Sequence, residues 1–188
     1  EESPRAVLEV PGAQLVLKAV VEGLVHKSEA GAVVTAIENA DRLREEFDSM
    51  AKRLAGRQGP RFAIQKHVEV ETEVIVGASR AAALGPMVMF GLGGIHVEVL
   101  RDVVFKLAPL SRHEAQGMIH GIRGAKILDG VRGRPAADKE KLVDLLLRVS
   151  CLVSDHPEIA ELDLNPVSVA PPGRPTRVLD YRIRIDRK

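Results

Sequence analysis

Two acidic side chains and one amide could form a metal site near the C-terminal end of the chain. Asp163 and Asn165 lie two residues apart in ELDLNP, so both side chains leave the same face of a β-strand. Leu162 and Leu164 then point the other way. Asp180 falls in the next apolar segment, whose pairing can set it beside Asn165. Such hard oxygens suit Mg²⁺ completed by phosphate, and the alternative is the polar outer face of a half-exposed strand.

A histidine, a lysine and a serine are adjacent in GLVHKSEAGAV, residues 23–33. His26 could be an exposed loop histidine, or it could act as a general base or a nucleophile. Lys27 and Ser28 beside it would suit a phosphate group. The other histidines are scattered and none lies at zinc-ligand spacing, which disfavours a structural metal site.

A lysine in an apolar segment and a glycine-rich stretch are two further candidates. Lys18 is centred in QLVLKAV, where an unpaired charge is costly to bury. It either extends out at the strand edge or points into a cleft and binds an anion such as phosphate. In GPMVMFGLGGIHVE, Gly93 and Gly94 allow close backbone approach. This stretch is not the dinucleotide fingerprint, which needs a glycine where His96 stands.

The elements that must position these residues form an α+β pattern with mostly antiparallel strands. Residues 14–20 and 32–37 are expected to pair as strands, and residues 39–54 to form a helix with one apolar stripe. Residues 61–68 and 72–79 are expected to pair with each other across an acidic turn.

The C-terminal half continues this pattern. Strands are expected in 85–91 and 96–110, and a helix after Ser111, with Glu114 completing a capping box. A long helix capped by Asp138 is expected to bury one face and to include Cys151 in its core. Its expected apolar face is Leu142, Leu145, Val149 and Leu152. Two final strands are expected in 159–170 and 176–185.

Composition excludes several classes of protein. Hydrophobic residues make up 45% of the 188, and Lys plus Arg (27) balance Asp plus Glu (26), so no field steers the chain to nucleic acid or a membrane surface. The single cysteine excludes an internal disulfide and fits a reducing compartment. No apolar stretch approaches the roughly 20 residues of a membrane helix, and no signal peptide is seen. A cytoplasmic protein is expected.

Several stretches in this order resemble one family. HKSEAGAV, IQKHV, TEVIVG, MFGLGG and ELDLNP, together with VLDYR, are similar to the ATP-grasp domain of NDP-forming acyl-CoA synthetases, the ADP-forming acetyl-CoA synthetases related to the succinyl-CoA synthetase β subunit. The resemblance runs from about residue 14 to residue 185. It implies an ATP-grasp fold of two α+β lobes, with a shortened N-terminal lobe over 1–66 and a C-terminal lobe over 67–188, inside a larger protein.

The resemblance also implies an acid–thiol ligase reaction that converts acyl-CoA, ADP and phosphate into acid, CoA and ATP through phosphohistidine. The cofactors would be ATP or ADP and Mg²⁺. The partner would be a CoA-ligase domain or α subunit, in the same chain or separate, with an acetyltransferase module as a further option. The isolated piece is expected to lack complete turnover.

The family's functional residues transfer position by position. His26 would carry phosphate, with Asp163 nearby, and Asn165 and Asp180 would bind Mg²⁺. Lys18 would hold nucleotide phosphates, and Glu73 would bind ribose. The hinge that reads adenine through its backbone would comprise Gln65, Lys66, His67 and Val68.

Some loop positions depart from the family. Ala32 stands where the family has a glycine, Lys66 where the hinge begins with glutamate, and residues 80–82 where it has Arg-Asp-Pro. These substitutions favour an alternative, a nucleotide-sensing regulatory domain of a protein acetyltransferase fusion. A β-type subunit for another acid, such as succinate or citrate, is a third reading.

Overall fold

Two compact units make up the chain. The computed structural model describes residues 4–10, 12–21, 30–57, 59–81, 83–94, 102–131 and 133–186. The first unit comprises Glu1–Glu69 and the second Val70–Lys188. This division lies three residues after the one expected between residues 66 and 67.

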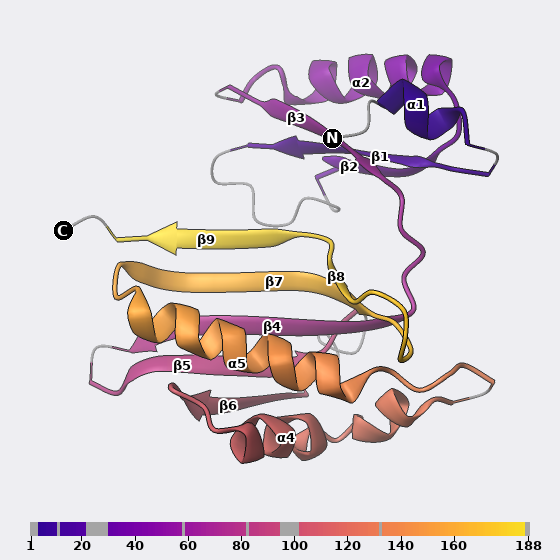
Figure 1. Ribbon diagram of the computed structural model, residues 1–188. Helices are drawn as coiled ribbons and strands as arrows, with labels where there is room; N and C mark the ends of the chain where they lie inside the picture. Colours follow the sequence, from indigo (N-terminus) through magenta and orange to yellow (C-terminus); the bar gives the residue numbers. More distant parts are fainter. Residues whose placement is uncertain are drawn as a thin grey trace. The chain divides into compact units, whose positions relative to one another are not determined.

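The first unit is a three-stranded antiparallel sheet with a helix packed on it (Figure 1). The helix begins after Asn39, whose side chain accepts the Arg42 N–H at 2.8 Å. Met50 and Leu54 of this helix are buried with Leu17 of the central strand. The elements, with strands in spatial order, are β2 (Val33–Ile37), β1 (Leu15–Val20), β3 (Arg61–Lys66), α1 (Pro4–Leu8) and α2 (Ala40–Leu54).

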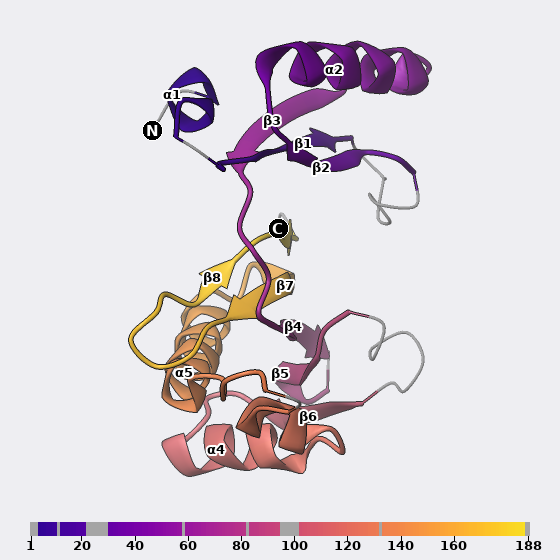
Figure 2. The same ribbon diagram turned by 90° about the vertical axis from the view of Figure 1, so that its right-hand side faces the viewer.

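The second unit is a six-stranded antiparallel sheet covered on one face by helices (Figure 2). Its helices pack on β4, β5 and their neighbours, and the core of the unit lies between helices and sheet. The strands in spatial order are β6 (Val103–Leu107), β5 (Gly85–Leu92), β4 (Thr72–Ala81), β7 (Ile159–Val169) and β8 (Arg177–Val178), with β9 (Tyr181–Ile185) also paired to β7. The helices are α4 (Arg112–Gly121), the 3-10 helix η1 (Ala125–Asp129) and α5 (Lys139–Asp155).

Side-chain caps fix where the two long helices of this unit begin. Ser111 accepts the Glu114 N–H at 3.2 Å, and the Glu114 carboxylate accepts the Ser111 N–H at 2.9 Å, so the expected capping box is confirmed. Hydrogen bonds donated to the Glu114 carboxylate by the Ser111 N–H and by the Ser111 hydroxyl hold the pKa of Glu114 below its ordinary value. Asp138 accepts the Lys141 N–H at 3.1 Å and caps α5 as expected.

The expected pairing of residues 61–68 with 72–79 is wrong. β3 pairs with β1, whereas β4 pairs with β5 and β7 in the other unit. The connection HVEVE lacks the Asn-Gly or Gly-containing turn that joins a tight hairpin. Phe62 of β3 packs against the core of the first unit, whereas Val74 and Val76 of β4 belong to the core of the second.

The buried face of α5 also differs from the expected one. Leu146 and Val153 are buried, whereas Leu152 is exposed and Leu145 is only partly covered. Cys151, expected in the core, is exposed and lies near the Asp155 carboxylate, with 3.6 Å between sulfur and oxygen. Apolar residues occur on more than one face of this helix, and packing against the sheet decides which face is buried.

The final segment forms two short strands instead of one. β8 and β9 both pair with β7, and the chain between them comprises Leu179 and Asp180. Within the described ranges, no helix combines the length and apolar character needed to cross a membrane.

Candidate functional site

The predicted metal-binding residues meet beside β7. Leu162 and Leu164 are buried in the core, whereas Asp163 is half-buried and Asn165 exposed, as the alternation predicts. The Asn165 N–H donates to the Asp180 carbonyl at 3.1 Å. Asp180 therefore lies beside Asn165, although it stands in the break between β8 and β9 instead of on a strand.

Electrostatics link Asp163 to the same group. Burial raises the pKa of Asp163, the negative charge of Asp180 raises it further, and Arg182 opposes both effects. Arg182 is the residue opposite Asp163 in the β7–β9 register. Two carboxylates and one amide thus share a small region of the second unit. Among the described residues, no three His, Cys, Asp or Glu side chains cluster as a metal site.

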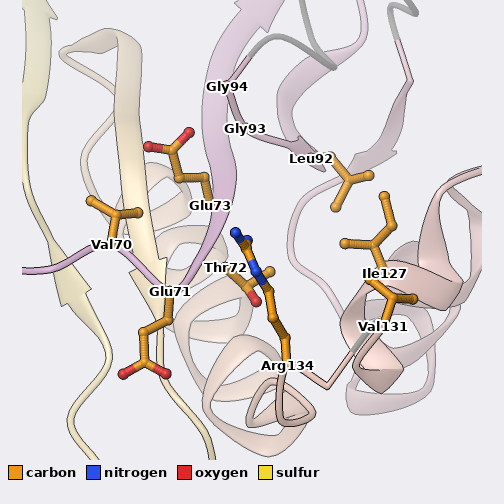
Figure 3. A pocket seen from close by; sticks show the side chains of 10 residues that line it. All are labelled: Val70, Glu71, Thr72, Glu73, Leu92, Gly93, Gly94, Ile127, Val131 and Arg134. Carbon is orange, nitrogen blue, oxygen red and sulfur yellow. The ribbon is translucent and has the colours of Figure 1, made fainter.

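A pocket of about 390 Å³ opens where β4 begins and β5 ends (Figure 3). Its volume falls in the range typical of small-molecule sites, roughly 300–1,000 Å³. All of its lining residues belong to the second unit. They are Val70, Glu71, Thr72, Glu73, Leu92, Gly93, Gly94, Ile127, Val131 and Arg134.

Glycines let two segments approach closely inside this pocket. The Gly93 N–H donates to the Glu73 carbonyl at 2.8 Å. A Cβ on Gly93 would lie 2.7 Å from the Glu73 Cβ, and one on Gly94 would lie 2.6 Å from a Glu73 carboxylate oxygen. Gly94 also has a φ of +64°, which side chains rarely adopt. The glycine pair therefore makes room for the Glu73 carboxylate.

The opposite wall of the pocket is apolar and held by a buried carboxylate. Asp102, 6% exposed, accepts the N–H groups of Arg123 and Gly124, each at 2.7 Å. This tether fixes the start of η1, which carries Ile127 into the pocket wall next to Leu92. Sequence reasoning gave no role to Asp102, although it lies in a stretch that resembles the family, or to Arg134.

The two sites lie along the same pair of strands. Glu73 and Gly77 are four residues apart on β4, and Gly77 is paired with Asp163 on β7. At about 3.3 Å per residue this separation is roughly 13 Å.

The remaining predicted residues belong to the first unit. Lys18 lies in the central strand β1, paired with Val33 and Ala63, and is half-buried. It alternates with the buried Leu17 and Ala19, so its side chain leaves the face opposite that core.

The hinge residues stand at the end of β3. Gln65 and Lys66 are exposed, while His67 and Val68 are half-buried. The His67 N–H already donates to the Gln14 carbonyl at 2.7 Å, so it is not free to read a base. His26, Lys27 and Ser28 lie outside the described residues.

Comparison with known proteins identifies the family. A family described as the ATP-grasp domain matches residues 1–185. The chain belongs to the ATP-grasp family. The ATP-grasp fold expected from the sequence motifs is thereby confirmed.

The ATP-grasp chain is homologous to the corresponding part of ADP-forming acetate–CoA ligases. It is 42% identical over 187 residues to acetate–CoA ligase [ADP-forming] I of Archaeoglobus fulgidus, covering 97% of this chain and 27% of that protein. It is 38% identical over 160 residues to the β subunit of acetate–CoA ligase [ADP-forming] I of Pyrococcus furiosus, covering 83% of this chain and 69% of that subunit. The chain thus spans about a quarter of the Archaeoglobus relative.

Solved structures show the same relationship. A dinucleotide-forming acetyl-coenzyme A synthetase 1 of Ca. Korarchaeum cryptofilum, with coenzyme A, Ca-AMPCP and HgCl⁺, has a TM-score of 0.85 at 33% identity, covering 99% of this chain and 83% of that one. The same protein with coenzyme A and Mg-AMPPCP, its phosphohistidine segment pointing towards the nucleotide binding site, has a TM-score of 0.79 at 36% identity, covering 92% and 76%.

Proposed function

We propose that this chain is the nucleotide-binding part of an ADP-forming acid–CoA ligase, in which it passes phosphate between His26 and ADP. The similar proteins of Archaeoglobus and Pyrococcus are named acetate–CoA ligases, and the Korarchaeum protein binds a magnesium complex of a nucleotide analogue. Acetate or a related acid is the proposed acyl substrate class.

One observation carries this proposal. Asp163 lies roughly 13 Å from Glu73 of the pocket along β4 and β7, and Asn165, with Asp180 beside it, lies between these two levels. The pocket offers an apolar wall and a carboxylate, which suit a base and the hydroxyls of a ribose. The other end offers hard oxygen donors, which suit Mg²⁺ and phosphate. The regions suited to base, ribose and phosphate thus follow one another along the sheet in the order in which these groups occur in a nucleotide.

The donor set fits magnesium. Asn165 and Asp180 would hold the ion, which supplies charge neutralisation for the phosphoryl oxygens when bound. Asp163 is kept partly desolvated beside them and can orient the imidazole of a phosphohistidine. Lys18 would place its ammonium group against nucleotide phosphates, with Lys27 and Ser28 beside the reacting histidine.

The proposed transfer balances with ADP, phosphohistidine and one proton from solvent. The N–P bond of phosphohistidine breaks as an oxygen of the ADP β-phosphate forms a new P–O bond, and the leaving ring nitrogen takes up the proton, which gives ATP and neutral imidazole. Imidazole suits this exchange because its ordinary pKa of about 6.5 leaves it largely neutral at pH 7. Such transfers depend mainly on positioning and charge stabilisation.

A partner is required for complete turnover, because acyl-CoA chemistry needs groups outside this proposed site. The Pyrococcus relative is a β subunit, whereas the Archaeoglobus relative is a longer chain. We propose a CoA-ligase portion as the partner, in the same chain or a separate one, working in the cytoplasm. The relatives described above are ligases, and none carries an acetyltransferase name, so the acetyltransferase fusion is not proposed.

The test is phosphorylation of the chain by γ-labelled ATP with Mg²⁺. Acid-labile label should appear on His26 and disappear in His26→Ala, because phosphoramidates hydrolyse in acid. His113→Ala is the matched control, since His113 is exposed on α4 and should leave labelling unchanged. Equal label in His26→Ala would exclude His26 as the phosphate carrier.

A further inference from the structure

We propose that Arg134 binds the nucleoside part of the nucleotide from the side of the pocket opposite Glu73. The inference rests on the proposed nucleotide-binding function and adds a residue that no motif indicates. Figure 3 shows the Arg134 side chain reaching into the middle of the pocket, with Glu73 on one side and Leu92, Ile127 and Val131 on the other.

The guanidinium of Arg134 is available for a ligand. It makes no hydrogen bond or ion pair with the described residues, and the side chain is exposed. The neighbouring acid Glu71 is already engaged, since Arg174 contacts its carboxylate at 2.5 Å. Glu73 and Arg134 thus present opposite charges to one pocket without a direct ion pair between them.

The backbone that carries Arg134 is firmly placed. Gly130 has a φ of +87°, and a Cβ there would lie 2.5 Å from the Arg134 carbonyl oxygen, so the turn folds tightly over this glycine. The Arg134 N–H donates to Val131 at 3.0 Å, and the Ala137 N–H donates to Leu128 at 2.9 Å. These backbone contacts hold the position from which the Arg134 side chain extends into the pocket.

The position of the pocket decides which part of a nucleotide Arg134 would contact. Asn165 and Asp163 follow one another along β7 away from the level of Glu73, with Asp163 roughly 13 Å from it, so phosphates would extend away from this pocket. Val131 and Ile127, on the same segment as Arg134, form the apolar wall that suits a base. Arg134 would therefore donate to acceptors on the base edge or the ribose, and not to the phosphates.

A ligand series tests this assignment. The affinities of ADP, ATP with Mg²⁺ and AMP are measured by titration calorimetry, and that of adenosine by competition, on the wild-type chain and Arg134→Gln. Loss of one charge-assisted hydrogen bond should weaken binding about tenfold. The loss should be the same for all four ligands, including adenosine, while Arg134→Lys should recover part of it.

Arg148→Gln is the matched control, because Arg148 is exposed on α5 and lines no part of the pocket. Unchanged affinity in Arg134→Gln, or a loss that grows with each phosphate, would overturn the assignment while leaving the proposed function intact. A wild-type chain that binds none of the four ligands would overturn both proposals.

Discussion

At the scale of single residues, Asp163 has surroundings that destabilise its charge, which are typical of binding or catalytic carboxylates. Its pKa is raised mainly by burial and also by Asp180, and the attraction of Arg182 does not compensate. The ionised form is therefore unfavourable in the folded chain when no ion or ligand is bound. Groups kept in such surroundings typically serve binding or catalysis instead of stability.

Asp163→Asn should raise the free energy of unfolding at pH 7, in the presence of EDTA and without nucleotide. The gain should not exceed about 1 kcal/mol, because solvent screens a half-exposed charge. Since the cost belongs to the ionised form, the difference from wild type should shrink as the pH falls through the raised pKa towards the ordinary value of 3.8. Urea unfolding at several pH values measures it.

Glu161→Gln is a suitable control for the unfolding measurement, because Glu161 forms an exposed ion pair with Arg184 and its replacement should give no comparable gain in the free energy of unfolding. In the ATP phosphorylation assay, Asp163→Asn should carry less label than wild type. If Asp163→Asn were less stable than wild type at pH 7, the interpretation that the Asp163 charge destabilises the folded chain would be contradicted.

At the scale of elements, the turn after β5 controls the pocket. Gly93 and Gly94 contact Glu73 near the start of the neighbouring strand β4, so the end of one strand positions the side chain of the next. The tether from Asp102 to the start of η1 acts in the same way on the apolar wall. The pocket depends on these close approaches between elements.

Gly94→Ala should lower the free energy of unfolding by about 1–2 kcal/mol, the cost of a side chain at positive φ. It should also weaken ADP binding, because the new Cβ would lie 2.6 Å from the Glu73 carboxylate and displace it. Chemical unfolding and calorimetric titration provide the two measurements.

Gly173→Ala separates these two effects. Gly173 has a φ of +86° and no atom within 4 Å of an added Cβ, so it carries the backbone cost alone. It should lose similar stability and keep wild-type ADP affinity. Equal ADP affinity in both variants would show that Gly94 does not position Glu73.

At the scale of the whole molecule, the chain has two separate hydrophobic cores. The buried cluster of the first unit is drawn from residues 15–54, and that of the second from residues 74–169. No described residue of one unit contributes to the core cluster of the other. Each unit therefore has the features of an independently folding body.

Residues 70–188 produced alone should unfold in a single cooperative transition. The six-stranded sheet, its helices and its whole core lie within this segment, which supports independent folding. Thermal unfolding followed by circular dichroism, compared with the complete chain, measures this. A fragment that lacks a cooperative transition would show that the first unit is needed to stabilise the second.

The sequence alone was sufficient to predict most helices and strands, the family, and the pairing of Asn165 with Asp180. The helices and strands depend on local periodicity and caps, which act over a few residues, whereas the family was indicated by the resemblance of several motifs in order and the pairing by the succession of two strand segments. Tertiary structure decided that β3 and β4 belong to different sheets and that α5 buries Leu146 and Val153 instead of Leu145 and Leu152.

Only the tertiary structure brought Arg134 to the same pocket as Glu73. Sixty residues of sequence separate the two, and their meeting depends on the register of β4 with β5 and on the tethered path of η1. Contacts of this kind arise when distant segments bury a common core, so no local pattern of residues specifies them.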